Sequence, residues 1–485
     1  VPRRRLARPR VEGSGVGIHT HTDYQWSNSY WLSQLLMYVS HHFLGSAIST
    51  LILSSLLSFI ILKIFNKHSK DITSTSILFI FLVLVISSFA VTVRPLYYST
   101  LFMFILIDVL LRKKSHNKLL PLIFLVWANM HADFVIGLFI LGIYSLFNFL
   151  EKTGFPKTKF RLIFPPWKNK KDTSKYLREI RSYFLRILRD KKTVGHAKKS
   201  FLILTFSFLA TFINPYGIKL WTTLLKELTQ PVKSFVAEWA PMGEIGLPYL
   251  AIGVFLAMGL LAGVTSNKTD RDKYKSWYVF LIFFFYPPSL TSSYFIRIFI
   301  IISSFSILDG FILLKKDIEK VTVKDAKKTL RYVLSPFLMF LLFSITPQLI
   351  KNLETALDTK LWSDIKNYPY KAVAYIKENK LEGKMMNEYS WGGYLIWQLP
   401  EYKTFIDGRM AAWRIDGNYL MEDHRKIYFK TEENEELLKK YLEEYDIKWI
   451  LHRPNSPIVK YLSEKNGDTW ETVYEDEASV ILLKK

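Results

Sequence analysis

Three polar residues interrupt an otherwise apolar part of the chain, and they are its strongest candidates for chemistry. Asn129, His131 and Asp133 lie between two apolar runs, residues 119–126 and 135–150. Ionisable groups at the depth of a bilayer cost about 3 kcal/mol on insertion scales, so they usually face a cavity or a pathway. His131 and Asp133 could therefore act as a base and the group that orients it, or share a divalent cation. The alternative is a simple turn between two short helices, although Gly, Ser or Asn would suit a turn better.

Two further carboxylates are candidates for acid–base work. Asp23 stands ahead of the first apolar segment, where a carboxylate near a membrane surface can take a proton from a hydroxyl or hold a divalent cation. Glu238 precedes Trp239 in a loop, and an apolar wall of this kind is typical of a carboxyl group that serves as acid or base. A solvated loop residue is the alternative for Asp23, and a structural role is the alternative for Glu238.

Two arginines are candidates to bind an anion. Arg94 precedes Pro95, which restricts the turn, and Arg297 lies inside the apolar run at residues 294–302. A guanidinium presents planar donors that fit a phosphate, and a buried guanidinium requires an anion. The alternative for Arg94 is a side chain that extends to the membrane surface from a helix end. The alternative for Arg297 is an internal ion pair with Asp309.

The composition places these residues in an α-helical polytopic membrane protein. Half of the 485 residues are hydrophobic, with 36 Phe and 27 Tyr, and the mean hydropathy is positive. The sequence contains no Cys, which excludes disulfides, zinc held by cysteine and thiol catalysis. About ten spans are predicted from the apolar runs. They lie at residues 44–65, 74–92, 97–112, 118–131, 134–150, 199–213, 248–264, 277–290, 293–314 and 331–350.

The Lys and Arg residues are concentrated in blocks between the predicted spans. This pattern gives the net charge of +23 a topological explanation, so nucleic acid is not a predicted partner. If the spans alternate in direction, all of these blocks lie on one side, and short basic loops remain cytoplasmic. The extracytoplasmic side then receives the candidate residues, and residues 21–44 form an interfacial helix on membrane lipids. The basic blocks are residues 63–70, 112–118, 151–199, 268–275 and 315–331.

The chain divides into three predicted parts. Residues 1–19 are Arg-rich and atypical, which indicates a foreign or truncated N-terminus, and residues 20–350 form the membrane domain with a basic cytoplasmic loop at 151–199. Residues 365–485 alternate between helical and strand patterns, which predicts a small extracytoplasmic α/β domain. Its helices are predicted at residues 370–379, 392–399, 434–445 and 457–465, and its strands at 385–388, 404–407, 448–452, 472–474 and 478–483.

Short motifs distributed from residue 24 to the end of the chain carry a family resemblance. They are Trp31-Leu32-Ser33, Arg94-Pro95, Trp127 to His131, Asn214 to Gly217, Glu238-Trp239, Trp391 to Trp397 and Asp407 to Arg409. As a set they resemble a bacterial group of uncharacterised membrane glycosyltransferase-like proteins within the GT-C class of polytopic glycosyltransferases. The segment around Trp391 also resembles the Trp-Trp-Asp-Tyr-Gly acceptor motif of oligosaccharyltransferase catalytic subunits, without its Asp. Ala132 and Asp133 stand where the bacterial group usually has Gly-Gly.

This resemblance implies a reaction and a set of roles. GT-C enzymes move a sugar from a lipid-linked, polyprenyl-phosphate donor to an extracytoplasmic acceptor, which here would be a glycan, lipid or protein at the bacterial cytoplasmic membrane. Their catalytic Asp lies in a loop after a first span that has no evident counterpart here, so Asp23 is its stand-in, and Mg or Mn is a candidate cofactor. The implied site comprises catalytic Asp23, Asp133, His131 and Glu238, donor-phosphate-binding Arg94 and Arg297, acceptor-binding Trp391, Tyr394, Asp407 and Arg409, and pocket residues Asn129, Asn214 and Tyr216.

Other functions and roles remain open from the sequence. A transporter or flippase for lipid-linked sugars would have repeated spans broken by Gly or Pro at the midplane, and no such repeat is evident. A non-catalytic membrane scaffold is the third hypothesis. Within the C-terminal domain, residues 391–397 could instead dock on the membrane surface, and residues 407–409 could form a β-turn with an internal ion pair.

Overall fold

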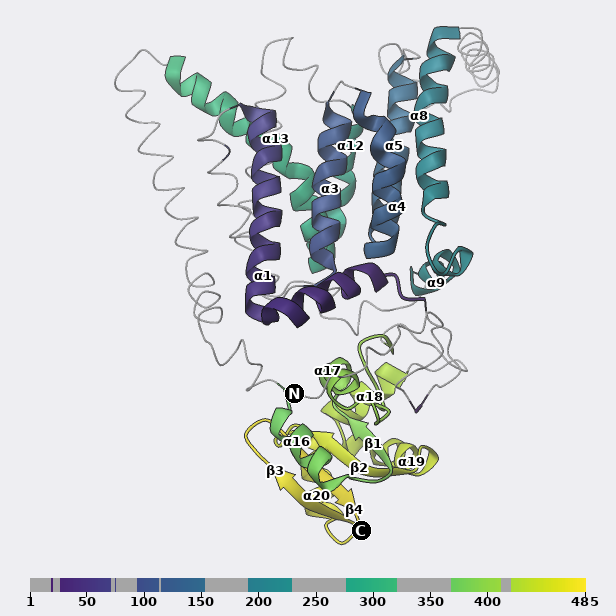
Figure 1. The fold of residues 1–485 in the computed structure, drawn as a ribbon, viewed down its shortest axis with the longest axis vertical. Coiled ribbons are helices and arrows are strands. Elements are labelled where there is room, and N and C mark those ends of the chain that lie inside the picture. Colours follow the sequence, from purple (N-terminus) through teal and green to yellow (C-terminus); the bar gives the residue numbers. More distant parts are fainter. Residues whose placement is uncertain are drawn as a thin grey trace, which may run out of the picture. The chain divides into compact units, whose positions relative to one another are not determined.

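The described residues fall into two compact units. The computed structural model describes residues 19–20, 27–70, 75, 94–112, 115–152, 191–228, 276–320, 368–410 and 420–485 (Figure 1). One unit comprises residues 29–217 and 241–350, and the other comprises residues 1–28, 218–240 and 351–485. The spans predicted at 248–264 and 331–350 lie outside the described residues, as does the span at 74–92 except for Thr75.

The first unit is helical. Its helices pack side by side, several of them roughly parallel or antiparallel to one another (Figure 1), and most contact at least two others. Their bounds agree with the corresponding predicted spans to within a few residues, except that α1 and α8 begin earlier and α13 ends later. The helices are α1 (Trp31–Ser69), α3 (Leu96–Leu111), α4 (Leu120–Met130), α5 (Phe134–Lys152), α8 (Lys191–Ala210), α12 (Ser276–Thr291) and α13 (Ser293–Lys320).

Helix α1 bends at Gly45, where φ is 76° and ψ is 168°. Glycine adopts this left-handed backbone conformation without the strain of a side chain, so the kink is placed by the sequence. Before the kink, several apolar side chains are exposed, and that of Phe43 is 77 % exposed. After it, Ile48–Ser69 is long and apolar enough to cross a membrane, and it is the one such stretch in the described residues. The other apolar helices of this unit that pass the same composition test are shorter.

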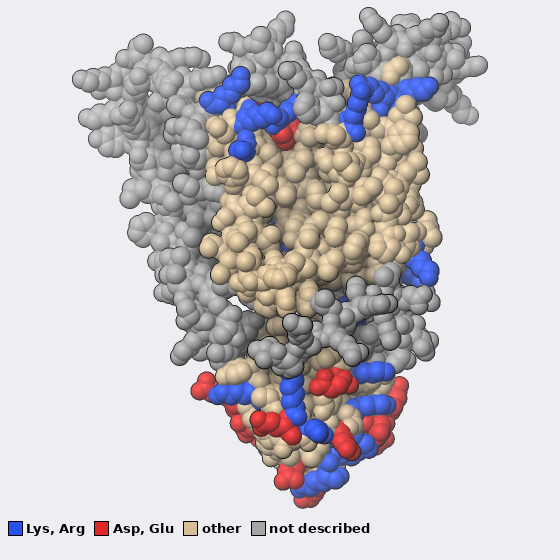
Figure 2. All heavy atoms as spheres, viewed as in Figure 1, with Lys and Arg blue, Asp and Glu red and all other residues tan. Residues whose placement is uncertain are grey.

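Charged residues lie at the ends of the helical unit. Figure 2 shows a group of Lys and Arg side chains at the end of this unit where α1 finishes and α8 begins, next to a broad surface of uncharged residues. Asp108 and Arg112, at the end of α3, form an ion pair of 2.6 Å at this same end. Among the described residues, the apolar runs therefore correspond to the central part of the unit, and the described parts of the basic blocks to its end.

Helices α4 and α5 pack closely on either side of a short turn. Trp127 of α4 is fully buried between Phe124 and Phe102, and its indole Nε1 donates to Ser99 at 2.8 Å. A Cβ at Gly137 of α5 would overlap the Trp127 ring. The absence of a side chain at Gly137 thus permits the close approach that fixes the turn between the two helices.

The second unit contains a four-stranded sheet of order β1-β2-β4-β3, in which β1 and β2 are parallel and the other pairs antiparallel. Both faces are covered, because alternate strand residues enter different cores. Met386 and Ile450 pack with α18, α19 and α20, whereas Met385 and Trp449 pack with α16 and α17. The elements are α9 (Ile218–Leu228), α16 (Tyr370–Asn379), β1 (Lys384–Asn387), α17 (Gly392–Gln398), α18 (Leu420–Phe429), α19 (Glu435–Glu444), β2 (Ile447–His452), α20 (Pro457–Lys465), β3 (Trp470–Glu475) and β4 (Val480–Lys484).

One predicted strand of this unit is wrong, and one helix was not predicted. Residues 404–407 form no strand, because their backbone contacts a short N-terminal stretch and then enters a turn. The His19 amide donates to the Thr404 carbonyl at 3.1 Å, and the Thr20 hydroxyl donates to the Phe405 carbonyl at 2.9 Å. Helix α18 was missed, whereas α16 and α20 have the predicted bounds.

Buried histidines should make the stability of this unit dependent on pH. Burial lowers the pKa of His424 and of His19 to about 4, and lowers that of His452 well below its usual value. The unfolded chain takes up these protons near pH 6.5 but the folded unit does not, so stability is full above pH 6.5 and falls as the pH drops toward 4. Over this range the free energy of unfolding falls by about 1.4 kcal/mol per pH unit for each histidine.

Hydrogen exchange of β1 and β2 in the full chain, measured between pH 7.5 and 5 after correction for intrinsic rates, would test this dependence. His424→Gln should reduce this dependence by about a third, because it removes one of the three histidines, whereas His42→Gln, at an exposed position in α1, should not change it. Stability that stays constant over this range would contradict the expectation.

Candidate functional site

The candidate site is built on the turn between α4 and α5. His131 ends α4 with extended backbone angles, and its amide donates to the Trp127 carbonyl at 3.0 Å. Asp133 precedes the first residue of α5, and its carbonyl accepts from the Gly137 amide at 3.0 Å. Asp133 therefore occupies the N-terminal end of α5, where the helix dipole favours a negative charge.

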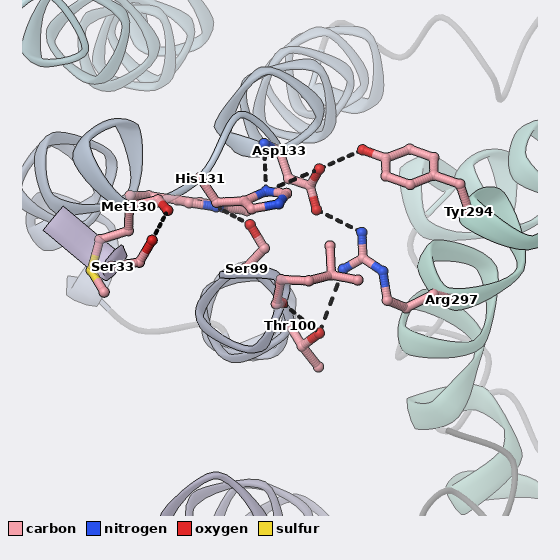
Figure 3. A network of polar contacts seen from close by, with 10 residues as sticks. Ser33, Ser99, Thr100, Met130, His131, Asp133, Tyr294 and Arg297 are labelled. Carbon is pink, nitrogen blue, oxygen red and sulfur yellow. Dashed lines mark hydrogen bonds and ion pairs between the residues drawn. The ribbon is translucent and has the colours of Figure 1, made fainter. Parts of the chain in front are cut away.

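The Asp133 carboxylate joins three side chains (Figure 3). Arg297 Nη2 donates to Oδ2 at 2.6 Å, the Tyr294 hydroxyl donates to Oδ1, and His131 Nδ1 lies 3.3 Å from Oδ1. Asp133 is 2 % exposed and Arg297 is 9 % exposed. Two charges removed from water in this way are tolerated because each compensates the other.

The Nδ1 atom of His131 can either accept or donate a hydrogen bond. Nδ1 lies 3.2 Å from the Asp133 amide nitrogen, from which it can accept, and 3.3 Å from the Asp133 carboxylate, to which it can donate. The tautomer that donates to the carboxylate has a free lone pair on Nε2. No contact among the described residues engages Nε2, and the ring packs against Tyr30 with centroids 5.0 Å apart. Asp133 can thus orient His131 as a base.

Arg297 retains unused donors. Its Nη1 is 3.5 Å from the Thr100 hydroxyl, a long contact, and its Nε is buried without a hydrogen-bond partner among the described residues. A buried N–H group without an acceptor is costly. An anionic ligand beside Arg297 could accept a hydrogen bond from this group and would bind more tightly as a result. The alternative pairing with Asp309 is wrong, because Asp309 lies 3.4 Å from His68 and Arg297 pairs with Asp133.

Asn129 ties three segments of the chain together. Its Oδ1 accepts from Trp31 Nε1 at 2.9 Å, and its Nδ2 donates to the carbonyls of Leu125 and Ile213 at 2.8 and 2.9 Å. Both amide donors are therefore used within the protein. The Ser33 hydroxyl lies 2.9 Å from the Met130 carbonyl, so the Trp31-Leu32-Ser33 motif docks on the end of α4. Asn129 therefore links Trp31 and Ile213 to the end of α4, next to the turn that carries His131.

The other residues predicted near this site have different outcomes. Asn214 forms a local turn, in which its Oδ1 accepts from the Tyr216 amide at 2.8 Å. Arg94 is exposed at the start of α3. Asp23 and Glu238 lie outside the described residues.

The four residues predicted to bind acceptor lie in the C-terminal unit. Asp407 is 1 % exposed and forms two bonds with the Arg409 guanidinium, at 2.7 and 2.9 Å. The Met410 amide donates to the Asp407 carbonyl at 3.0 Å, so this motif is the β-turn with an internal ion pair. Trp391 is fully buried, and the half-buried Tyr394 lies in a group of aromatic rings.

Neither protein-family models nor curated protein sequences give a match to this chain. The site is therefore interpreted from its own geometry. Sequence reasoning missed Tyr294, although its position three residues before Arg297 puts both on one helical face. Within the described ranges no group of three or more His, Asp or Glu side chains could hold a metal ion, and the Mg or Mn cofactor stays a prediction.

Proposed function

We propose that this chain is a polytopic membrane glycosyltransferase that moves a sugar from a polyprenyl-phosphate donor to an extracytoplasmic acceptor. The observation that carries the proposal is the buried cluster of His131, Asp133 and Arg297 at one end of an apolar helical unit. Ionisable groups in such surroundings are usually functional, and this cluster pairs a proton acceptor with an anion-binding group. The apolar surface beside a basic end supports the membrane setting.

In the proposed reaction, His131 acts as the general base. Its Nε2 takes the proton of the acceptor hydroxyl while the hydroxyl oxygen bonds to the anomeric carbon of the donor sugar. The bond from that carbon to the phosphate oxygen breaks, and polyprenyl phosphate leaves with one more negative charge. Asp133 accepts the Nδ1 proton of His131 in a hydrogen bond and stabilises the imidazolium that forms.

Arg297 is suited to the leaving phosphate. Its Nη2 is held by Asp133, while Nη1 and Nε point donors at positions without a strong acceptor in the described structure. As the bond to the sugar breaks, charge develops on the phosphate, and fixed donors in a dry site favour that change. Thr100 is the neighbouring hydroxyl that a phosphate oxygen would replace as the Nη1 partner.

The decisive experiment measures transfer of labelled sugar from undecaprenyl-phosphate-linked hexoses in membranes that contain the full chain. His131→Gln should reduce transfer by about 100-fold or more, since general bases typically contribute that much. Binding of the labelled donor should be unchanged by this substitution but weakened by Arg297→Lys, which loses the planar donors. Asp309→Asn removes a buried carboxylate next to His68 and should leave transfer unchanged.

Two results would overturn the proposal. One is transfer that survives in the His131→Gln chain at the rate of the unsubstituted chain. The other is movement of labelled lipid between leaflets without any sugar transfer, which would favour a flippase.

A further inference from the structure

A second polar group lies at the carboxyl edge of the two parallel strands. Strand β1 ends at Asn387 and β2 ends at His452, and the next residues along the chain are Glu388 and Arg453. The Glu388 amide donates to the Leu451 carbonyl at 3.1 Å, which keeps the two strand ends adjacent. Carboxyl ends of parallel strands meet at one edge, so side chains that follow them converge.

The Arg453 guanidinium has few partners. It lies over the ring of buried Trp391, with its Cζ atom 5.2 Å from the ring centroid. Its one described hydrogen bond is a long contact of 3.4 Å from Nη2 to the Ser390 hydroxyl. No carboxylate in the described residues lies within ion-pair distance of it, and Arg453 is half-buried. Its remaining donors are therefore available to a planar anion from solvent.

Glu388 complements Arg453 across Ser390. The exposed Ser390 hydroxyl donates to the Glu388 carboxylate on one side and contacts Arg453 on the other. Glu388 is 7 % exposed and has no cation within ion-pair distance among the described residues. A nearby aromatic hydroxyl, that of Tyr389, has its pKa raised to about 12 by burial and by the carboxylates of Asp407 and Glu388, so it stays protonated.

We infer that Arg453, Ser390 and Glu388 form a binding site for a sugar acid, a ligand that carries one carboxylate and adjacent hydroxyl groups. The guanidinium takes the carboxylate in a two-pronged contact, and Glu388 accepts a hydrogen bond from a ligand hydroxyl. A phosphate dianion fits less well, because Glu388 repels its second charge. A neutral sugar lacks the group that Arg453 requires. The site does not depend on the proposed transfer reaction.

Ligand-observed saturation-transfer NMR on the full chain in detergent would test this inference with glucuronate, acetate, glucose and inorganic phosphate. Glucuronate should bind more tightly than the other three. Arg453→Gln should weaken glucuronate binding by about tenfold or more, and Arg453→Lys should weaken it as well, because the planar fork is lost. Glu388→Gln should weaken glucuronate binding and leave acetate binding unchanged.

Arg425→Gln is the matched control, because Arg425 also lies over an aromatic ring, that of Phe429, at 5.6 Å. It should leave glucuronate binding unchanged, and the thermal unfolding of all variants should show that they are folded. The inference is overturned if glucuronate fails to bind at concentrations on the order of 10 mM. Equal binding of glucuronate to the Arg453→Gln and unsubstituted chains would overturn it too, as would tighter binding of phosphate.

Discussion

Replacing Asp133 by Asn should destabilise the helical unit by about 3–5 kcal/mol, the usual cost of breaking a buried ion pair from one side. The reason is that Arg297 would keep its charge at 9 % exposure while losing the carboxylate 2.6 Å from its Nη2. An Asn side chain offers one neutral acceptor in place of a charge. Tyr294 would lose the same strong acceptor. Equilibrium unfolding in mixed detergent micelles, followed by tryptophan fluorescence, would measure the change.

Asp108→Asn is the matched control for this substitution. Asp108 is also a buried aspartate paired with an arginine at 2.6 Å, but the Arg112 side chain is 25 % exposed and can remain hydrated. The expected cost is therefore about 1 kcal/mol. A double substitution, Asp133→Asn with Arg297→Met, should recover more than half of the loss, because the uncompensated charge is removed as well. Equal losses of stability for Asp133→Asn and Asp108→Asn would contradict the expectation that burial makes the Asp133–Arg297 pair more costly to break.

The partners of Asp133 illustrate what a sequence can and cannot reveal. The apolar runs that flank His131 and Asp133 predicted the helices α4 and α5 and the turn between them, because length and composition decide those elements locally. Arg297 is 164 residues away along the chain. Its pairing with Asp133 rather than with Asp309 depends on how α13 packs against the other helices, which no local pattern determines.

The C-terminal unit shows the same division between local and distant information. Helices α16 and α20 were predicted with their observed bounds, because Pro and the apolar spacing mark them within a few residues. The strand predicted at residues 404–407 failed, because its backbone neighbour is His19, far away in sequence. Arg453 was missed because its surroundings also come from distant segments. The fold places Trp391 and Ser390 beside it, and the proposed anion site depends on these two contacts.

Gly392→Ala should destabilise the C-terminal unit by about 3 kcal/mol, at the upper end of the usual cost of overpacking. Gly392 begins α17, and a Cβ there would overlap the Ile406 carbonyl oxygen and the Asp407 backbone. Neither can move freely, since the Ile406 carbonyl accepts from Asn387 Nδ2 at 2.9 Å and the Asp407 carbonyl closes the turn to Met410 at 3.0 Å. The substitution must therefore separate α17 from the turn or break these bonds.

The adjacent glycine supplies the control for this expectation. A Cβ at Gly393 meets nothing within 4 Å, and this residue lies in the same helix, so Gly393→Ala should stabilise the unit by about 0.5–1 kcal/mol through helix propensity. Hydrogen exchange of β1 and β2 in the full chain would measure both changes. If the two substitutions had the same effect, the close contact of Gly392 with Asp407 would not constrain the unit. Opposite signs would show that the first glycine of the Trp-Gly-Gly motif is required by packing against the Asp-Gly-Arg turn.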